Sequence, residues 1–166
     1  MKSEELVVSN TSPLLNLALL DRLELVETQF STVAVPQAVW HELTAGTDGV
    51  DALQSARDDG TIRVVSAPET KLFVEFRHEL DAGEAAALAY ALENDATLVL
   101  IDERDGRQAA RRHDLTVTGV VGVLLRAAED GDEMRASLDS LREAGFWIGD
   151  DLYEKATEQA DSDERY

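Results

Sequence analysis

The chain has 166 residues, of which 44% are hydrophobic and 30% are charged, a composition typical of globular proteins and unlike disordered or fibrous ones. This length gives room for one domain of ordinary size with a sizeable buried core. The sequence contains no cysteine. Disulfides, thiolate catalysis, zinc fingers and iron–sulfur clusters are therefore excluded.

The charge balance is strongly acidic. Thirty-four Asp and Glu residues oppose fifteen Lys and Arg residues, for a net charge of −19, and Lys2, Lys71 and Lys155 are the only lysines. Such a surface repels itself at low ionic strength, and salt screens the repulsion. This composition resembles that of halophilic archaea, so we predict adaptation to high salt. The alternative is an acidic protein from a mesophilic organism. A local nucleic-acid site is compatible with either.

No stretch of the sequence reaches the ~18 consecutive apolar residues that a membrane-spanning helix needs. The apolar run that follows Glu5 is interrupted by the polar residues and proline at 9–13. We therefore expect a soluble, cytoplasmic protein without a membrane partner.

Short β-branched runs alternate with helical patterns along the chain. In order, the sequence predicts a strand at 6–9, a helix from 12, a strand at 32–35, helices at 36–44 and 50–58, a strand at 62–66, helices at 69–79 and 82–94, a strand at 97–101, a helix at 105–113, a strand at 116–118, and helices at 120–129 and 133–143. Ser12 is the predicted N-cap of the first helix, with Pro13 after it, and Asp81 is the predicted N-cap of the helix at 82–94.

This alternation predicts an α/β fold with a parallel sheet covered by helices on both faces. Without repeats or low-complexity linkers, residues 1–150 are expected to form one domain. A C-terminal helix and polar tail follow at 151–166, and the tail is expected to fray into disorder from residue 161. The apolar run at 120–125 and the region of Trp147 are predicted to belong to the core, with an interaction surface as the alternative.

Polar side chains follow two predicted strands directly. Asn10 comes after the first strand and Asp102 after the strand at 97–101. In open parallel sheets, ligand sites gather outside the carboxyl ends of the strands. The alternative explanations are turn chemistry for Asn10 and a helix N-cap for Asp102.

Two further carboxylates lie close to apolar helix faces. Glu84 shares a face with Leu88 and Ala91 on an alanine-rich helix, where burial of a carboxylate is costly unless it is paired or bound to a metal. Its alternative role is that of a first-turn acid that complements the helix dipole. Glu42 borders the apolar stripe of its helix, and a solvated helix acid is its alternative.

Several carboxylates without a histidine pair indicate a hard divalent cation, because Mg²⁺ prefers oxygen ligands. Such an ion can activate water against a phosphodiester and neutralise charge on the phosphate. The three histidines, His41, His78 and His113, are isolated in the sequence, which argues against a zinc enzyme.

Five segments of the chain resemble, in order, motifs of the PIN-domain family. They are VSNTSPL at 8–14, VPQAVWHEL at 35–43, DAGEAAAL at 81–88, LIDERDGRQAA at 100–110 and TGVVGVL at 118–124. The first resembles the S-[DN]-[ST]-S-P-L opening of one subfamily. Each match is weak alone, but five in family order, covering about residues 6–131, are a strong resemblance.

The resemblance implies a PIN-like three-layer α/β/α sandwich and a ribonuclease that depends on Mg²⁺ or Mn²⁺. Many members of the family are VapC-type toxins, which form homodimers and are held by an antitoxin protein. A toxin that cleaves RNA and has an antitoxin partner is therefore the expected function. A catalytically weakened module that binds RNA or a protein partner is the alternative.

The resemblance also implies roles for individual residues. Glu42, Glu84 and Asp102 match the catalytic acids, and Asn10, Glu84 and Asp102 match the metal ligands. Asp102 or a water molecule on the metal would generate the nucleophile. Residues expected in support are Ser12, Glu103 and Asp105.

Asn10 departs from the family pattern, which has Asp at this position in most members. An amide oxygen can still bind a cation, but it brings no charge, so weaker metal binding is expected.

The helix after Asp102 carries a basic cluster. Arg104, Arg107 and Arg111 share one face at spacings i, i+3 and i+7. Contact with RNA phosphates is one explanation, and pairing with local acids, such as Glu103 with Arg107, is the other.

Overall fold

A computed structural model describes residues 5–162 of the chain. The strands are β1 (Val7–Ser9), β2 (Val33–Pro36), β3 (Ile62–Val65), β4 (Leu98–Leu100) and β5 (Val117–Thr118). The helices are α1 (Thr11–Leu19), α2 (Glu24–Phe30), α3 (Gln37–Leu43), α4 (Val50–Asp58), α5 (Lys71–Phe76), α6 (Ala82–Glu93), α7 (Arg104–Arg112), α8 (Val120–Ala127), α9 (Gly131–Glu143) and α10 (Asp150–Asp161).

The five strands form one parallel sheet in the order β3-β2-β1-β4-β5. The chain moves outward from β1 to β3, then returns to the other side of β1 with β4. The neighbours β1 and β4 therefore mark the point where the strand order reverses, which is where ligand sites form in such sheets. Val8 pairs with Ala34 on β2 and with Val99 on β4.

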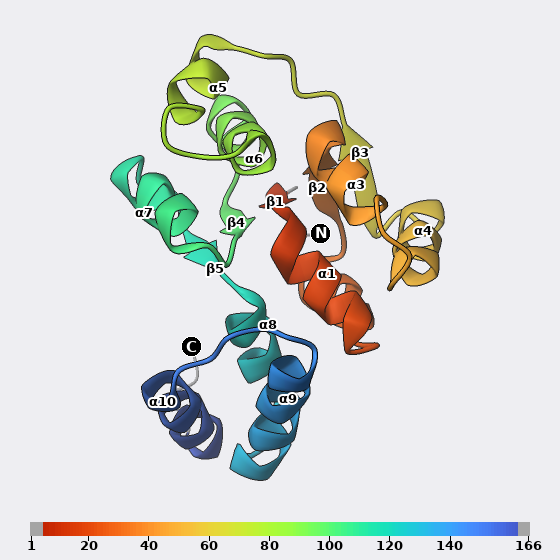
Figure 1. Ribbon diagram of the computed structural model, residues 1–166, viewed down its shortest axis with the longest axis vertical. Coiled ribbons are helices and arrows are strands. Elements are labelled where there is room, and N and C mark those ends of the chain that lie inside the picture. The colour runs from red at the N-terminus through yellow and green to blue at the C-terminus, as the bar shows by residue number, and fades with distance from the viewer. Residues whose placement is uncertain (1–4, 163–166) are drawn as a thin grey trace.

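Alternate residues of each central strand enter two separate cores. On one face, side chains such as Val7, Val35 and Leu100 pack with the helices α1–α4 and α8–α10. On the other face, Val8 and Val99 pack with α5–α7. Figure 1 shows the strands between these two helical layers, and the predicted three-layer α/β/α sandwich is thereby confirmed.

Every predicted strand is present within two residues of its expected bounds, whereas several helices differ from the prediction. Helix α2, at Glu24–Phe30, was not predicted, because its start has neither a capping side chain nor the proline that precedes the equally short α3. Helix α5 is shorter than the predicted 69–79, since Thr70 caps it through a bond from the Phe73 amide to the Thr70 hydroxyl.

The predicted start of the first helix was wrong. Helix α1 begins at Thr11, with Asn10 in the N-cap position and without a side-chain cap, so Ser12 lies inside the first turn. Pro13 is tolerated there because the amides of the first turn have no helical acceptor. The Ser12 hydroxyl is free for a different contact, described below.

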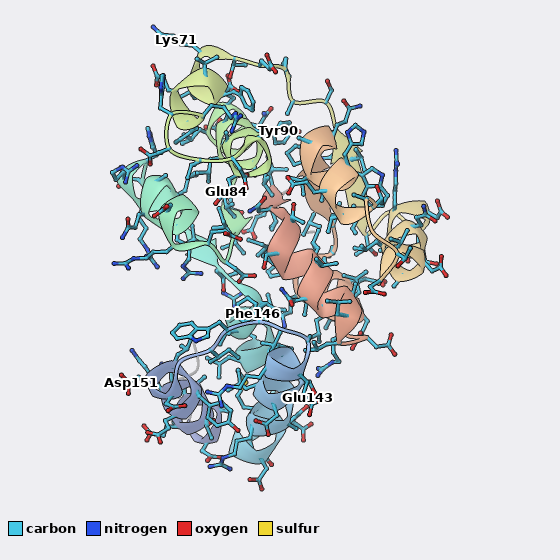
Figure 2. The ribbon with its side chains drawn as sticks, in the orientation of Figure 1. Lys71, Glu84, Tyr90, Glu143, Phe146 and Asp151 are labelled. Carbon is cyan, nitrogen blue, oxygen red and sulfur yellow. The ribbon has the colours of Figure 1, made fainter. Side chains whose placement is uncertain are left out.

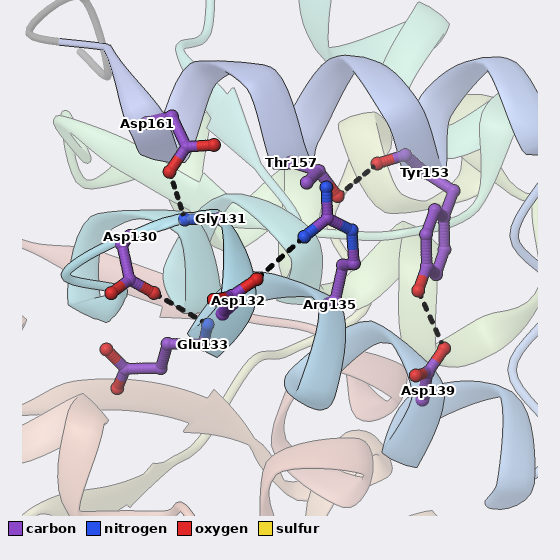
Figure 3. A network of polar contacts seen from close by, with 9 residues as sticks. All are labelled: Asp130, Gly131, Asp132, Glu133, Arg135, Asp139, Tyr153, Thr157 and Asp161. Atoms are coloured by element: carbon purple, nitrogen blue, oxygen red, sulfur yellow. Dashed lines mark hydrogen bonds and ion pairs between the residues drawn. The ribbon is translucent and has the colours of Figure 1, made fainter.

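The C-terminal helix continues through Asp161, where the sequence predicted fraying. Helix α10 packs against α9, and the Asp161 carboxylate accepts a hydrogen bond of 2.6 Å from the Gly131 amide at the start of α9 (Figure 3). Asp130 caps the same helix end by accepting from the Glu133 amide at 2.9 Å. Two carboxylates thus accept from two of the first-turn amides of α9, which have no acceptor within the helix. The rest of the predicted tail, from residue 163, lies outside the described residues.

The two segments predicted for the core behave differently. Within 120–125, four of the six residues are buried, as expected. Trp147, in the loop between α9 and α10, has 85% of its surface exposed, so its predicted burial was wrong. Across residues 5–162, none of the helices combines the length and the apolar composition needed to pass through a bilayer.

Candidate functional site

The carboxyl ends of β1 and β4 bring Asn10 and Asp102 to one edge of the sheet. The backbone amide of Asn10 donates a 2.9 Å hydrogen bond to the Leu100 carbonyl, which joins the chain after β1 to the end of β4. Asn10 is buried, with 3% of its surface exposed. Asp102 follows β4 by two residues, and the N-cap position of α7 belongs to Glu103, so Asp102 is not a helix cap.

Two donors hold the Asp102 carboxylate. The Ser12 hydroxyl donates to Oδ2 at 2.8 Å, and the Val120 amide, at the start of α8, donates to Oδ1 at 2.8 Å. Burial raises the pKa of Asp102, while the bonds from Val120 and Ser12 and the nearby Arg107 charge lower it. Asp102 therefore ties α1 and α8 to the end of β4, and both of its oxygens keep a second lone pair.

Asn16, one helical turn after Ser12, extends this arrangement. Its Nδ2 lies 3.1 Å from the Ser12 hydroxyl oxygen and 3.0 Å from the Ser12 carbonyl oxygen, and the residue is buried. Sequence analysis did not select Asn16. The available signal was its spacing of four residues from Ser12, which places both on one helix face.

Glu84 lies in the first turn of α6 and faces the same edge. It forms a capping box with Asp81: the Glu84 amide donates to Asp81 at 2.8 Å, and the Asp81 amide donates to Glu84 Oε1 at 3.2 Å. The helix-end role considered from the sequence is therefore present. The capping bond uses Glu84 Oε1. The other oxygen, Oε2, lies toward α7, 3.0 Å from the position that a Cβ on Gly106 would take. Figure 2 shows Glu84 on the inner side of α6, between that helix and α7.

The electrostatic state of Glu84 is unusual. Burial, first of all, raises its pKa to about 7, and the bond from the Asp81 amide opposes the rise. The negative charges of Asp81 and Glu103 contribute to this rise. Glu84 is thus poised to hold or release a proton near neutral pH.

Glu42 reaches the site from the end of α3, across a glycine of α6. A Cβ on Gly83 would overlap Glu42 Oε1 and would lie 3.5 Å from Asn10 Oδ1. The two oxygens therefore lie close to one another over the bare backbone of Gly83. A glycine at this position is what allows α3 to place a carboxylate beside β1.

The pKa of Glu42 is also raised. Burial is the main cause, and the charges of Asp81 and Glu103 add to it. The buried Thr11 hydroxyl, which lies near Glu42 without full hydrogen-bond geometry, acts in the opposite direction.

Of the predicted supporting acids, Glu103 belongs to the cluster more closely than Asp105. The pKa of Glu103 is raised by burial and by the charges of Asp81, Asp102 and Asp105. Both Glu103 and Asp105 are exposed at the start of α7. Asp81, predicted only as a helix cap, contributes to this acidic edge as well.

The three predicted arginines separate into two kinds. Arg104 and Arg111 are exposed on α7. Arg107 is half-buried, and its Nη1 donates a 3.1 Å bond to the Ile101 carbonyl, beside Asp102. Burial and the Arg111 charge lower the pKa of Arg107, whereas Asp102 raises it. The positive charge of Arg107 thus offsets part of the negative charge of Asp102.

The donor set of this edge fits a hard divalent cation by its chemistry. Carboxylate and amide oxygens from Asn10, Glu42, Glu84 and Asp102 come from four separate elements, and oxygen is the ligand that Mg²⁺ prefers. Within the described ranges, no three Asp, Glu or His side chains stand close enough to hold one ion as they lie. Joint ligation would therefore require side-chain rotation.

A family model described as a PIN domain matches residues 6–162. The chain belongs to the PIN-domain family. The match confirms the family inferred from the five motifs, and it includes α9 and α10. No curated protein matches the chain. The acidic edge thus lies at the strand ends of a nuclease fold.

Proposed function

We propose that this PIN-domain protein is an endoribonuclease that hydrolyses RNA phosphodiesters with Mg²⁺ or Mn²⁺. The observation that carries the proposal is the convergence of Asn10, Glu42, Glu84 and Asp102 at the strand ends where β1 meets β4. Three of these residues are acids, and burial of Glu84 and Asp102 is costly, so that a cation would offset that cost.

The residues would divide the work according to their contacts. Asn10 Oδ1, Glu84 Oε2 and Asp102 would hold the metal, with Glu42 completing the shell through water. When bound, the ion would neutralise charge on the scissile phosphate and activate the attacking water. Because the pKa of Glu84 is about 7, its carboxyl can exchange a proton at neutral pH. Asp102 is held in one orientation by Ser12 and Val120.

The exposed arginines of α7 would contact the RNA. Arg104 and Arg111 lie on the helix that follows Asp102, and guanidinium groups bind phosphate oxygens through paired hydrogen bonds. Arg107, whose guanidinium is engaged with the Ile101 carbonyl, would instead support Asp102.

The second candidate function is a non-catalytic PIN module that binds RNA or a protein. Asn10 favours it, because an amide in place of the usual carboxylate removes one negative charge from the metal shell. The retention of Glu42, Glu84 and Asp102 together favours the nuclease.

The decisive experiment is a crystal soaked in millimolar Mn²⁺ at high salt, with the ion located by anomalous scattering. The nuclease proposal expects a peak among Asn10, Glu84 and Asp102 that is lost in Glu84→Gln and Asp102→Asn. No peak, with the acids instead bonded to arginines, would favour the binding module. This test is preferable to an activity assay, because an enzyme with one RNA target is inactive on other RNAs.

We further propose that the protein is the toxin of a toxin–antitoxin pair, that it acts in the cytoplasm, and that it forms a homodimer. A small DNA-binding protein encoded beside it, and a dimeric mass by light scattering, would support these points. A lone gene would count against the antitoxin without affecting the proposed chemistry.

A further inference from the structure

Asn16, Ser12 and Asp102 form a chain of hydrogen bonds that runs from the interior of α1 to the acidic edge. Asn16 Nδ2 contacts both the carbonyl and the hydroxyl of Ser12, and the Ser12 hydroxyl lies 2.8 Å from Asp102 Oδ2. Asn16 is 8% exposed and occupies the middle of α1, where asparagine is a poor helix former. Its presence there therefore needs a reason other than helix propensity.

The direction of this chain is fixed by elementary donor and acceptor rules. The Ser12 carbonyl can only accept, so the Asn16 atom 3.0 Å from it must be the amide nitrogen and not the oxygen. The same nitrogen then donates to the Ser12 hydroxyl oxygen. With its oxygen acting as acceptor toward Asn16, the hydroxyl can direct its single proton to Asp102.

We propose that Asn16 is a positioning residue, which sets the polarity of the Ser12 hydroxyl so that this group always donates to Asp102. A freely rotating serine hydroxyl would at times turn its proton away and present a lone pair to the carboxylate. Asn16 removes those states and keeps Asp102 oriented. The consequence for metal binding rests on the proposed function, whereas the hydrogen-bond polarity does not.

The test uses two nearly isosteric replacements in the full-length chain. Asn16→Asp cannot donate from an ionised carboxylate and would draw the Ser12 proton toward itself, so the polarity reverses. Asn16→Leu keeps the branched shape, with somewhat larger methyl groups in place of the amide atoms, but imposes no polarity. Each is made alone and combined with Ser12→Ala, which gives a double-mutant cycle.

For Mn²⁺ titrated by calorimetry, we expect Asn16→Asp to weaken binding about tenfold, the lower end of what loss of an outer-shell partner costs. Asn16→Leu should weaken it less. In the Ser12→Ala background, the loss from Asn16→Asp should vanish or change sign, because only the added negative charge remains to act on the cation.

A second readout needs no metal. The Val120 amide donates to the other oxygen of Asp102, so its proton chemical shift reports the position of that carboxylate. We expect Asn16→Asp to shift this resonance clearly, and to do so only when Ser12 is present. If wild type binds no Mn²⁺, the proposed function fails while this measurement still tests the polarity.

Two results would overturn the proposal. One is an equal effect of Asn16→Asp with and without Ser12, in the Mn²⁺ affinity and in the Val120 shift. The other is an effect of Asn16→Leu as large as that of Asn16→Asp, with both effects proportional to the thermal stability that each variant loses. That result would indicate that Asn16 has a packing role alone.

Discussion

The Ser12 hydroxyl and the Asp102 carboxylate are ninety residues apart in sequence and 2.8 Å apart in the fold. This contact joins the first turn of α1 to the end of β4, and the Val120 amide adds α8 to the same carboxylate. One acid thus organises three elements around the edge where Asn10, Glu42 and Glu84 also lie. A substitution of Asp102 would therefore disturb both the candidate site and the packing of these elements. Only variants that leave Asp102 in place can separate the two effects.

Binding of Mn²⁺ should depend on pH through Glu84. With a pKa of about 7, Glu84 keeps its proton in mildly acidic solution, and a cation must displace that proton. We expect the Mn²⁺ affinity to fall by up to about tenfold for each pH unit below 7, and to level off above it. Calorimetry from about pH 5.5 to 8.5 measures this. A profile of Glu84→Gln as steep as that of wild type would assign the dependence to another group.

The same group predicts the pH dependence of stability without metal. The folded pKa of about 7 exceeds the ordinary value of 4.5 for an unpaired glutamate, so between these values the folded state binds a proton that the unfolded state lacks. The free energy of unfolding should therefore fall as pH rises through this window. Urea denaturation at several pH values measures the slope. Glu84→Gln should reduce it, and an unchanged slope would contradict the assignment.

Asn10→Asp should strengthen Mn²⁺ binding. The substitution adds a negative charge next to Glu42, in the position where the family pattern has Asp, and we expect a gain of about tenfold or more. Asn94→Asp, at the far end of α6, is the matched control for the change in net charge. If Asn10→Asp binds no better than Asn94→Asp, then Asn10 does not belong to the metal shell.

Much of this architecture was predictable because its signals are local. Short β-branched runs between helical periods specify a parallel sheet, and the strand ends then bring Asn10 and Asp102 together. The PIN motifs predicted Glu42 and Glu84 as well, although neither residue has a local signal that places it beside Asn10. What places Glu42 beside Asn10 is the packing of α3 against Gly83 of α6, which is a tertiary contact.

The errors have physical causes too. Trp147 was assigned to the core because large aromatic residues are buried on average, yet it lies on the surface. Ser12 was assigned as a cap because serine is common there, but its hydroxyl belongs to Asp102. Asn16 was missed because its partner groups become apparent only once Ser12 is placed. For Trp147 and Ser12, a long-range contact, or its absence, overrides a residue preference.

Gly83→Ala should separate metal binding from stability. The new methyl group would overlap Glu42 Oε1, and Glu42 is exposed, so its carboxylate can swing away at little cost. Alanine is also a better helix former than glycine, by up to about 1 kcal/mol. We expect unchanged or higher thermal stability together with weaker Mn²⁺ binding, similar to that of Glu42→Gln. A stability loss above about 2 kcal/mol would instead show that α3 packs rigidly on Gly83.

Asp161→Ala should destabilise the fold by about 1 kcal/mol, the usual cost of losing a helix-end carboxylate. The reason is the bond from the Gly131 amide to Asp161, which fastens the end of α10 to the start of α9 (Figure 3). Denaturant unfolding measures the change. Glu158→Ala, at an exposed position of the same helix, is the control and should be near neutral. Equal effects of both variants would mean that the α10 terminus is frayed.

Salt should stabilise the protein strongly if its acidic surface is an adaptation to salt. With a net charge of −19, the folded state repels itself, and the screening length falls from about 10 Å at 0.1 M to about 3 Å at 1 M. We therefore expect the thermal midpoint to rise through this range. Screening predicts the same gain in NaCl and KCl at equal ionic strength. A midpoint that does not move in either chloride salt, and rises only in sulfate, would contradict a screening origin, because sulfate strengthens apolar burial in any protein.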